Sequence, residues 1–223
     1  MPAMKMKQFA VIGLGRFGSS LAKELVNQGL EVLGIDRDEE AVEELSDILT
    51  HAIVADSTEE ETLRSIGIRN FDCAIVAIGD DIQASIMTAI LLKDLGVKKV
   101  VAKALTELHG KVLERLGVDR IIYPERDMGI RVAHQLANPN LLDYIELSKD
   151  YTIAELSVPQ RLNGVTLKEL DTRARYGCSI VALNKINGII IAPVASDVIN
   201  ERDVMVIIGT NKQIESFEDE LVT

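Results

Sequence analysis

The sequence predicts an α/β protein, in which a Rossmann-type, doubly wound parallel sheet is followed by a small α+β C-terminal lobe. Three observations support this fold class. Short apolar runs alternate with helical patterns up to about residue 138, a Gly-x-Gly-x-x-Gly turn follows the first run, and the alternation stops at Asn138-Pro139-Asn140. Because Asn-Pro-Asn breaks regular structure, we expect an N-terminal domain over residues 4–138 and a C-terminal domain over residues 141–223.

The glycine turn follows the apolar run Phe9–Ile12, which is predicted to be the first strand. In this spacing Gly13 makes the tight turn, Gly15 lets the backbone approach a pyrophosphate, and Gly18 lets the next helix pack closely on the strand. The helix that follows offers unpaired N–H groups and the positive end of its dipole to an anion. The turn is therefore a candidate phosphate-binding site.

Asp36 ends the second predicted strand and completes this pattern. The helix after the turn is expected to end at Gly29, where a left-handed residue is favoured, and a strand follows over 31–35. Asp36 then lies eighteen residues beyond Gly18, close to the spacing of a carboxylate that binds ribose hydroxyls. Glycines alone also mark ordinary turns, but strand, helix and carboxylate in this order predict a bound adenine nucleotide. A carboxylate here also disfavours the 2′-phosphate of NADP.

The later part of the N-terminal domain continues the alternation. Strands are predicted over 51–55, 73–78, 99–104 and 120–123. Helices are predicted over 38–47, 59–66, 82–95, 108–116 and 125–138. The run 73–78 is apolar throughout, as a strand covered on both faces requires. This alternation predicts parallel strands joined by crossover helices.

The C-terminal lobe has a different pattern. Strands are predicted over 141–147, 152–158, 179–183, 188–192 and 204–208, and helices over 166–175 and 212–221. Asn187-Gly188 is a hairpin signal between two of these strands. A lobe of this size is too small for a typical catalytic domain.

Composition limits the possible partners and the location. The chain has 24 lysines and arginines against 35 aspartates and glutamates, a net charge of −11. Nucleic acid is therefore disfavoured as a partner, because binding a phosphate backbone needs clustered positive charge. Cys73 and Cys178 lie in apolar segments without metal-ligand spacing and are expected to be buried, reduced thiols. Because no apolar run reaches the roughly 18 residues of a membrane span and no signal peptide is evident, we expect a cytosolic protein.

Arg16 is the unusual residue of the glycine turn, since a positive charge at a helix start opposes the dipole. It is either a solvated arginine or a phosphate contact, and the second interpretation favours a more highly phosphorylated nucleotide over a diphosphate. Asp56, at the end of the third strand, either lies near the base or is a turn residue before Ser57. Helix dipoles explain three further charged residues equally well. Glu125 is at a helix start, where an acidic residue is favourable, and Arg173 and Arg175 are near a helix end, where basic residues are favourable.

Groups for catalysis are not evident. A dehydrogenase needs a proton donor or acceptor beside the nicotinamide, most often histidine. His51, His109 and His134 are interpreted as surface or interdomain residues, and no nucleophile elbow, Walker-A loop or metal-binding cluster is found. We expect a regulatory protein rather than an enzyme, with an NAD-dependent dehydrogenase as the alternative. A redox-sensing transcriptional regulator is disfavoured by the acidic charge and by the lack of an evident winged helix.

Several motifs together resemble the RCK/KTN (TrkA-like) family. They are FAVIGLGRFG at 9–18, Asp36, Ala55-Asp56, 76–79 followed by Gln83-Ala84-Ser85, DRIIYPE at 119–125, and Tyr176-Gly177-Cys178 before a strand. The resemblance covers essentially the whole chain and is greatest to the cytosolic gating subunits of bacterial Ktr-type potassium uptake systems.

This resemblance implies a ligand-gated regulatory subunit. In that family a homo-octameric ring, a tetramer of dimers, lies under a membrane potassium channel subunit of the Trk/Ktr/HKT type, peripheral to the inner face of the cell membrane. ATP and ADP compete for the glycine-turn site and ATP favours the conducting state, with NAD(H) as a further candidate ligand.

The resemblance also assigns roles to single residues. Gly13, Gly15 and Arg16 would face the phosphates, with Arg16 sensing the γ-phosphate partly across a dimer interface, and Asp36 would bind the ribose. Glu125 would help to bind a divalent or monovalent cation, completed by groups of a neighbouring subunit. The whole nucleotide site is predicted to be Gly13, Gly15, Arg16, Phe17, Gly18, Asp36, Arg37, Asp56, Ser57, Ile78, Gly79, Lys103 and Glu125.

The C-terminal lobe is similar to a module that binds cyclic di-AMP as an inhibitor between two subunits. By this resemblance Arg173 and Ala174 would approach the ligand, with Arg173 near its phosphates. Ser179, Ile180 and Pro193 would line the pocket.

Overall fold

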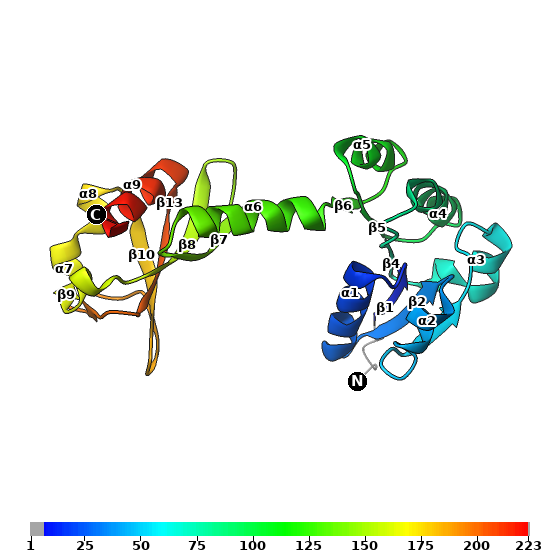
Figure 1. Ribbon diagram of the computed structural model, residues 1–223, viewed down its shortest axis with the longest axis horizontal. Coiled ribbons are helices and arrows are strands. Elements are labelled where there is room, and N and C mark those ends of the chain that lie inside the picture. The colour runs from blue at the N-terminus through cyan, green and yellow to red at the C-terminus, as the bar shows by residue number, and fades with distance from the viewer. Residues whose placement is uncertain (1–6, 223) are drawn as a thin grey trace, which may run out of the picture. The chain divides into compact units, whose positions relative to one another are not determined.

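The chain forms two compact units, which divide between Arg126 and Asp127 (Figure 1). The structure is a computed structural model and describes residues 7–222. Residues 4–6 and 223 of the two predicted domains therefore lie outside the described residues. The division falls inside a helix, whereas the predicted boundary follows residue 138, and the limits 4–138 and 141–223 stay predictions.

The first unit contains a six-stranded parallel sheet of order β3-β2-β1-β4-β5-β6. Its strands are β1 (Gln8–Ile12), β2 (Glu31–Asp36), β3 (His51–Val54), β4 (Cys73–Val76), β5 (Val100–Lys103) and β6 (Arg120–Ile122). In the register, Ala10 of β1 pairs with Leu33 of β2 on one side and with Ala74 of β4 on the other. The strand order reverses beside β1, and ligands of open α/β sheets bind at such a point, outside the carboxyl ends of the strands.

Helices cover both faces of this sheet (Figure 1). They are α1 (Arg16–Asn27), α2 (Glu39–Glu43), α3 (Glu60–Ile66), α4 (Ile82–Asp94) and α5 (Glu107–Arg115), with a 3₁₀ turn η1 (Ile68–Asn70) after α3. Ile12 of β1 belongs to an apolar cluster with residues of α3, α4 and α5, whereas its neighbour Val11 packs with residues of α1 and α2. Because both faces are buried, the inner strands are almost wholly apolar. The predicted doubly wound, Rossmann-type sheet is confirmed.

The helix predicted over 38–47 is shorter than expected. Asp38 caps α2 through a bond from Glu40 N, but α2 ends at Glu43. After it the chain makes turns, and the buried Leu49 reaches the sheet, where a Cβ on Gly34 would lie only 2.6 Å from Leu49 Cδ1. Burial of this leucine against a glycine overrides the helical pattern of the sequence.

The second unit is built on a five-stranded antiparallel sheet of order β11-β10-β13-β8-β7. The strands are β7 (Leu141–Glu146), β8 (Tyr151–Ser157), β10 (Ser179–Lys185), β11 (Gly188–Ile191) and β13 (Val204–Thr210). The helix α6 (Pro124–Ala137) precedes them, and α9 (Asn211–Val222) places Phe217 in the apolar core beside Leu156 and Met205. The predicted hairpin is confirmed, although Lys185 pairs with Gly188, so that its turn consists of Ile186 and Asn187.

The single helix predicted over 166–175 is wrong. The segment forms two short helices, α7 (Leu167–Leu170) and α8 (Thr172–Arg175), because Asp171 between them is left-handed with φ 43°. Thr166 and Glu169 form a capping box that fixes the start of α7. The sequence also missed β9 (Val165–Thr166) and β12 (Val198–Ile199), which pair with each other, and the 3₁₀ turn η2 (Gln160–Leu162).

Both cysteines are buried free thiols, as predicted, and burial raises the pKa of each. Within residues 7–222, none of the helices has the length and apolar character needed to cross a membrane.

Candidate functional site

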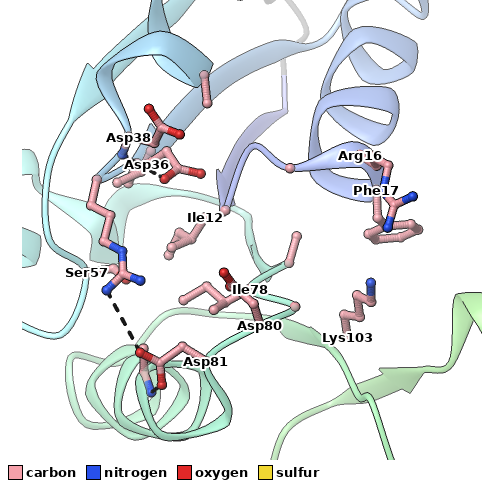
Figure 2. A pocket seen from close by; sticks show the side chains of 18 of the residues that line it. Ile12, Arg16, Phe17, Asp36, Asp38, Ser57, Ile78, Asp80, Asp81 and Lys103 are labelled. Atoms are coloured by element: carbon pink, nitrogen blue, oxygen red, sulfur yellow. Dashed lines mark hydrogen bonds and ion pairs between the residues drawn. The ribbon is translucent and has the colours of Figure 1, made fainter.

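A pocket of about 580 Å³ lies at the carboxyl ends of the parallel strands. Figure 2 shows its side chains converging from the ends of several strands and from the start of α1. Twelve of the thirteen residues predicted for the nucleotide site line it. The exception is Gly18, which is buried within α1.

The glycine turn has the close contacts that its spacing predicts. Gly13 has φ +94°, and a Cβ on it would lie 2.9 Å from the backbone of Ala77 and of Ile78. A Cβ on Gly18 would lie 1.8 Å from Gly13 O, so only glycine lets α1 pack this close to the turn. Gly15 differs, because nothing lies within 4 Å of the place of its Cβ. Its open side faces the pocket, where a ligand could approach the backbone.

The start of α1 is suited to an anion. Gly15 is the N-cap and provides no side-chain hydrogen bond, and the first turn of this 12-residue helix contains no acidic residue. The dipole and the first N–H groups of α1 are therefore not compensated by a capping side chain. Arg16 is the first helical residue, as predicted, and is exposed. In Figure 2 Arg16 and Phe17 lie at the same end of the pocket as Lys103.

Asp36 supports the glycine turn, a role that the sequence reasoning missed. Its Oδ2 accepts a hydrogen bond of 2.6 Å from Leu14 N, and its Oδ1 accepts one of 3.0 Å from Asp38 N. A carboxylate has about four acceptor positions, so both oxygens can still accept from ribose hydroxyls. Asp36 thus fixes the turn and also faces the predicted place of the ribose.

Asp56 is a turn residue, one of the two alternatives left open by the sequence, and it also lines the pocket, while its place near the base stays a prediction. Its Oδ1 accepts hydrogen bonds from Thr58 Oγ1 at 2.6 Å and from Thr58 N at 2.8 Å. These bonds hold the pKa of Asp56 below its ordinary value, and Arg37 contributes less. The next residue, Ser57, bonds to Thr88 of α4 at 2.8 Å, which ties this loop to the helix.

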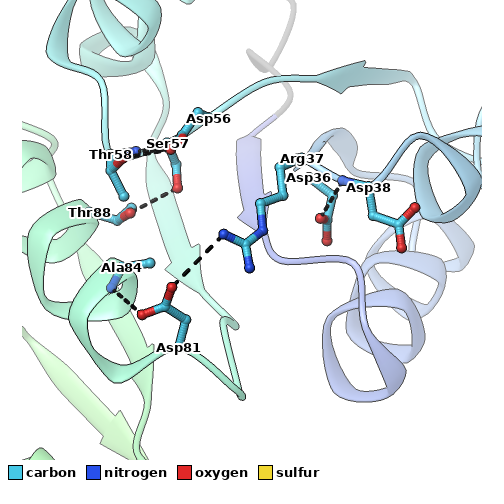
Figure 3. A network of polar contacts seen from close by, with 9 residues as sticks. All are labelled: Asp36, Arg37, Asp38, Asp56, Ser57, Thr58, Asp81, Ala84 and Thr88. Atoms are coloured by element: carbon cyan, nitrogen blue, oxygen red, sulfur yellow. Dashed lines mark hydrogen bonds and ion pairs between the residues drawn. The ribbon is translucent and has the colours of Figure 1, made fainter.

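An ion pair joins two sides of the pocket at the end away from Arg16 and Lys103 (Figure 2). Arg37, which follows β2, lies 3.9 Å from Asp81 at the start of α4 (Figure 3). Asp81 also caps α4 by accepting a bond of 2.9 Å from Ala84 N. Asp81 was missed as a site residue, although an aspartate directly before a predicted helix is a capping signal.

Lys103 and Glu125 form an ion pair that lines the pocket. Lys103 Nζ donates a 2.6 Å hydrogen bond to Glu125 Oε1, with Lys103 8% exposed and Glu125 67% exposed. This bond is the main cause that lowers the pKa of Glu125, and Arg16 contributes less. Lys103 Nζ also lies 5.9 Å from the centre of the Phe17 ring and 3.4 Å from the place where a Cβ on Gly79 would be.

The sequence missed the remaining lining residues for two reasons. The apolar ones only close the walls, and the acidic ones have no fixed spacing from the glycine turn. They are Ile12, Ile35, Asp38, Ala41, Ala55, Thr58, Ala77, Asp80, Asp81, Ala84 and Leu105.

Within residues 7–222 no group of three or more histidine, cysteine, aspartate or glutamate side chains could hold a metal ion. Glu125 already accepts from an ammonium group. The side chains of residues 7–222 alone therefore do not make a cation site, and the cation site at Glu125 stays a prediction.

His109 corrects one interpretation of the sequence. It is 2% exposed in α5 and is neither a surface nor an interdomain residue, because Leu113 and Gly110 of the same helix are also buried in the first unit. Its Nδ1 accepts a bond of 3.4 Å from Leu105 N, and burial lowers its pKa. His51 and His134 are exposed, as expected.

The residues predicted for cyclic di-AMP belong to three segments of the second unit. Arg173 and Ala174 are exposed on α8, and Ser179 and Ile180 begin β10 and are half-buried. Pro193 follows Ala192. The backbone N–H of Ala192 donates a hydrogen bond of 2.9 Å to the carbonyl oxygen of Val181, the residue after Ile180. Their role stays a prediction.

Two protein families match the chain. The TrkA-N domain matches residues 9–124, and the TrkA-C domain matches residues 148–222. The first match covers every residue that lines the pocket except Glu125.

Relatives and solved structures extend the match to the whole chain. The chain is 48% identical to the Ktr system potassium uptake protein C of Bacillus subtilis, over 95% of this chain and 96% of that protein. It is also 48% identical to the Ktr system potassium uptake protein A of the same organism, over 99% of both. These names denote potassium uptake proteins and not enzymes.

The GsuK channel has the same fold as this chain, with a TM-score of 0.72 at 18% identity over 99% of this chain and 40% of that channel. A second GsuK structure, bound to NAD, has a TM-score of 0.67 at 17% identity over 100% of this chain and 40% of that channel. The chain thus spans 40% of the channel that it matches. Together the two matched domains and the long alignments establish that the chain belongs to the RCK/KTN family of TrkA-N and TrkA-C domain proteins, which includes the Ktr potassium uptake proteins.

Proposed function

We propose that this chain is the cytosolic, nucleotide-gated regulatory subunit of a Ktr-type potassium uptake system. The pocket at the glycine turn carries the proposal, because twelve of the thirteen predicted nucleotide residues line it. The names of the two Bacillus subtilis relatives, which align with nearly the whole chain, support the role in potassium uptake. The NAD bound to the same fold in GsuK supports a nucleotide as the ligand.

ATP and ADP are the ligands that we assign to this pocket, with NAD(H) as the alternative. Asp36 would hold the ribose, while the start of α1, Arg16 and Lys103 would meet the phosphates. Two cationic side chains beside an uncompensated helix start favour a ligand with several phosphate charges. Arg16 is the exposed one of the two and would sense the γ-phosphate.

Gating would be a shift between two conformations of the assembled protein. ATP and ADP must bind these conformations with different affinities, since equal binding moves no equilibrium. A coupling free energy of about 1–3 kcal/mol between a ligand site and a conformational change is typical. Several nucleotide sites in one ring would together supply the free energy that shifts the equilibrium. ATP would favour the conducting state.

Replacement of Arg16 tests the ligand assignment. In calorimetric titrations Arg16→Ala should reduce the preference for ATP over ADP, because the γ-phosphate loses a cationic contact. Arg64→Ala is the control, since Arg64 pairs with Glu60 on α3 outside the pocket. An unchanged ATP/ADP ratio in Arg16→Ala means that Arg16 is not the sensor.

The assembly that we propose is a homo-octamer, a tetramer of dimers, on the cytoplasmic side of a membrane subunit of the Trk/Ktr/HKT type. After gentle extraction of membranes, this chain should co-purify with a potassium transporter that has several membrane-spanning segments. If no membrane protein accompanies it, the gating role loses its main support.

An activating divalent or monovalent cation at Glu125 is a further part of the proposal. The exposed carboxylate of Glu125 is suited to a cation, but the remaining ligands would have to come from the nucleotide or a second copy. Titration of magnesium with and without ATP tests this: binding should require the nucleotide and should weaken in Glu125→Gln.

Cyclic di-AMP is proposed as an inhibitor that binds the second unit. Arg173 would contact its phosphates, and Arg173→Ala should weaken binding about tenfold or more, as expected for a charge-assisted contact. Arg175→Ala in the same short helix is a matched control, because Arg175 lies over the ring of Tyr176. If Arg173→Ala and Arg175→Ala bind cyclic di-AMP equally well, Arg173 does not contact the ligand.

A further inference from the structure

Lys103 is a buried cation that donates a hydrogen bond to an exposed anion, Glu125. Its side chain is 8% exposed, and the Glu125 carboxylate that receives its hydrogen bond is 67% exposed. A buried ammonium needs a compensating charge, because leaving it unpaired away from water is costly. Glu125 can move into water at little cost, whereas Lys103 is enclosed.

The ammonium of Lys103 lies beside the predicted phosphate position. Gly79 lies beside it, since the place of a Cβ on this residue would be in ordinary van der Waals contact with Lys103 Nζ, at 3.4 Å. The neighbouring residues Ala77 and Ile78 lie against Gly13 of the glycine turn. The Phe17 ring, from the first turn of α1, lies 5.9 Å from the same Nζ. A phosphate held at the turn would therefore be close to this ammonium.

We propose that Glu125 is an internal substitute for phosphate: its carboxylate occupies Lys103 until a nucleotide phosphate replaces it. This inference rests on the proposed nucleotide site and adds to it a competition between a side chain and the ligand. Carboxylate and phosphate oxygens accept the same charge-assisted bonds from an ammonium. A phosphate at the turn receives bonds from the start of α1 as well, so it displaces the carboxylate.

Replacement of the Glu125 carboxylate by phosphate at Lys103 changes the contacts at the start of α6. Glu125 is the second residue of α6, and α6 continues past Arg126 into the second unit. Release of Glu125 from Lys103 removes a bond between β5 and the first turn of α6. Phosphate binding is thereby linked to the segment that joins the two units.

Affinity measurements in EDTA test the competition, since no divalent cation can then bind at Glu125. Glu125→Gln should bind ADP and ATP about three- to tenfold more tightly than the wild type, because the competing charge is lost. Lys103→Met should weaken binding about tenfold or more. In the double variant Lys103→Met/Glu125→Gln the gain from the glutamine should vanish. Adenosine, measured by competition, should bind all four proteins alike.

Two matched variants separate this effect from a general change of charge. Glu60→Gln removes a carboxylate that pairs with Arg64, and Lys98→Met removes an ammonium that pairs with Asp72, both outside the pocket. Neither should alter ADP affinity beyond about twofold.

The outcomes are distinct. If the wild type binds ADP but Glu125→Gln binds it no more tightly, the competition is refuted while the proposed function stands. A gain that persists in the double variant also refutes it, because Lys103 is then not the shared group. If the wild type binds no adenine nucleotide at all, both proposals fail.

Discussion

Neighbouring strands run parallel in the first unit and antiparallel in the sheet of the second. In the first unit all strands therefore end at one edge, and their last residues meet around one pocket. In the second unit successive strands end at opposite edges, and the residues proposed to bind cyclic di-AMP come from a helix, a strand start and a loop. Parallel topology collects functional side chains at a place that can be foreseen, whereas antiparallel topology distributes them.

Two pocket carboxyl groups of the first unit differ in pKa from a buried carboxyl group of the second unit. In the first unit Asp56 and Glu125 have lowered pKa values, because hydrogen bonds from Thr58 and Lys103 stabilise the charged form. In the second unit Glu218 of α9 is 7% exposed, and burial together with the charges of Glu215 and Asp219 raises its pKa to about 7. The first unit organises charge around a pocket, and the second unit buries a carboxyl group in its core.

The largest effect is expected at the glycine turn. Gly18→Val should destabilise the first unit by about 3 kcal/mol or more, because even its Cβ would lie 1.8 Å from Gly13 O. Gly15→Ala is the matched control: it has room for a Cβ, so stability should hardly change while ADP affinity falls. Urea unfolding and calorimetry measure the two quantities. Normal stability in Gly18→Val would contradict the packing role of this glycine.

Asp36 should have the next largest effect, because it supports the turn and is also proposed to bind the ligand. Asp36→Ala leaves Leu14 N without its 2.6 Å acceptor next to a buried side chain, which should cost about 2 kcal/mol. It should also weaken binding of nucleotides that carry ribose. Asp47→Asn is the control, since Asp47 is exposed and lies outside the pocket. If Asp36→Ala affects binding but not unfolding, the turn does not depend on this carboxylate.

Glu218 allows a pH test of the second unit. The folded pKa of about 7 lies above the ordinary value of 4.5, so the folded state binds this proton more tightly than the unfolded state. Stability from this group is complete below about pH 4.5 and is lost as the pH rises through 7. Glu218→Gln should therefore stabilise the protein by about 1–3 kcal/mol at pH 8 and hardly at pH 4.5. Unfolding curves at both pH values measure this change in stability, and Glu155→Gln, at an exposed position, is the control. An equal gain in stability at both pH values would contradict the effect of burial.

The smallest effect is expected at Ala192, which has φ 52° in the loop after β11. Alanine is strained in this left-handed conformation and glycine is not, so Ala192→Gly should stabilise the second unit by up to about 1 kcal/mol. Exposed Ala174→Gly in α8 is the opposite control and should destabilise by a similar amount. A loss of stability in Ala192→Gly would contradict the strain at this position.

The sequence predicted the first unit well because each of its signals has one local cause. The glycine spacing, Asp36 at the end of β2 and the left-handed Gly29 all appear where the pattern placed them. What could not be foreseen depends on contacts distant in sequence. Leu49 ends α2 early by packing on Gly34, and Lys103 meets Glu125 only because β5 and β6 are neighbours.

In the second unit the missed features have local and distant causes. Asp171 is left-handed between two helical turns, and aspartate tolerates that conformation without marking it in the pattern. The strands β9 and β12 have two residues each and exist only because they pair with each other. The capping box of Thr166 and Glu169 was readable and would have marked the start of α7.

Potassium flux through reconstituted membrane subunits tests the central claim most directly. With this chain bound, flux should be higher in ATP than in ADP, and Arg16→Ala should reduce that difference while the chain still binds both nucleotides. Equal flux in ATP and ADP with the wild-type chain bound would contradict nucleotide gating.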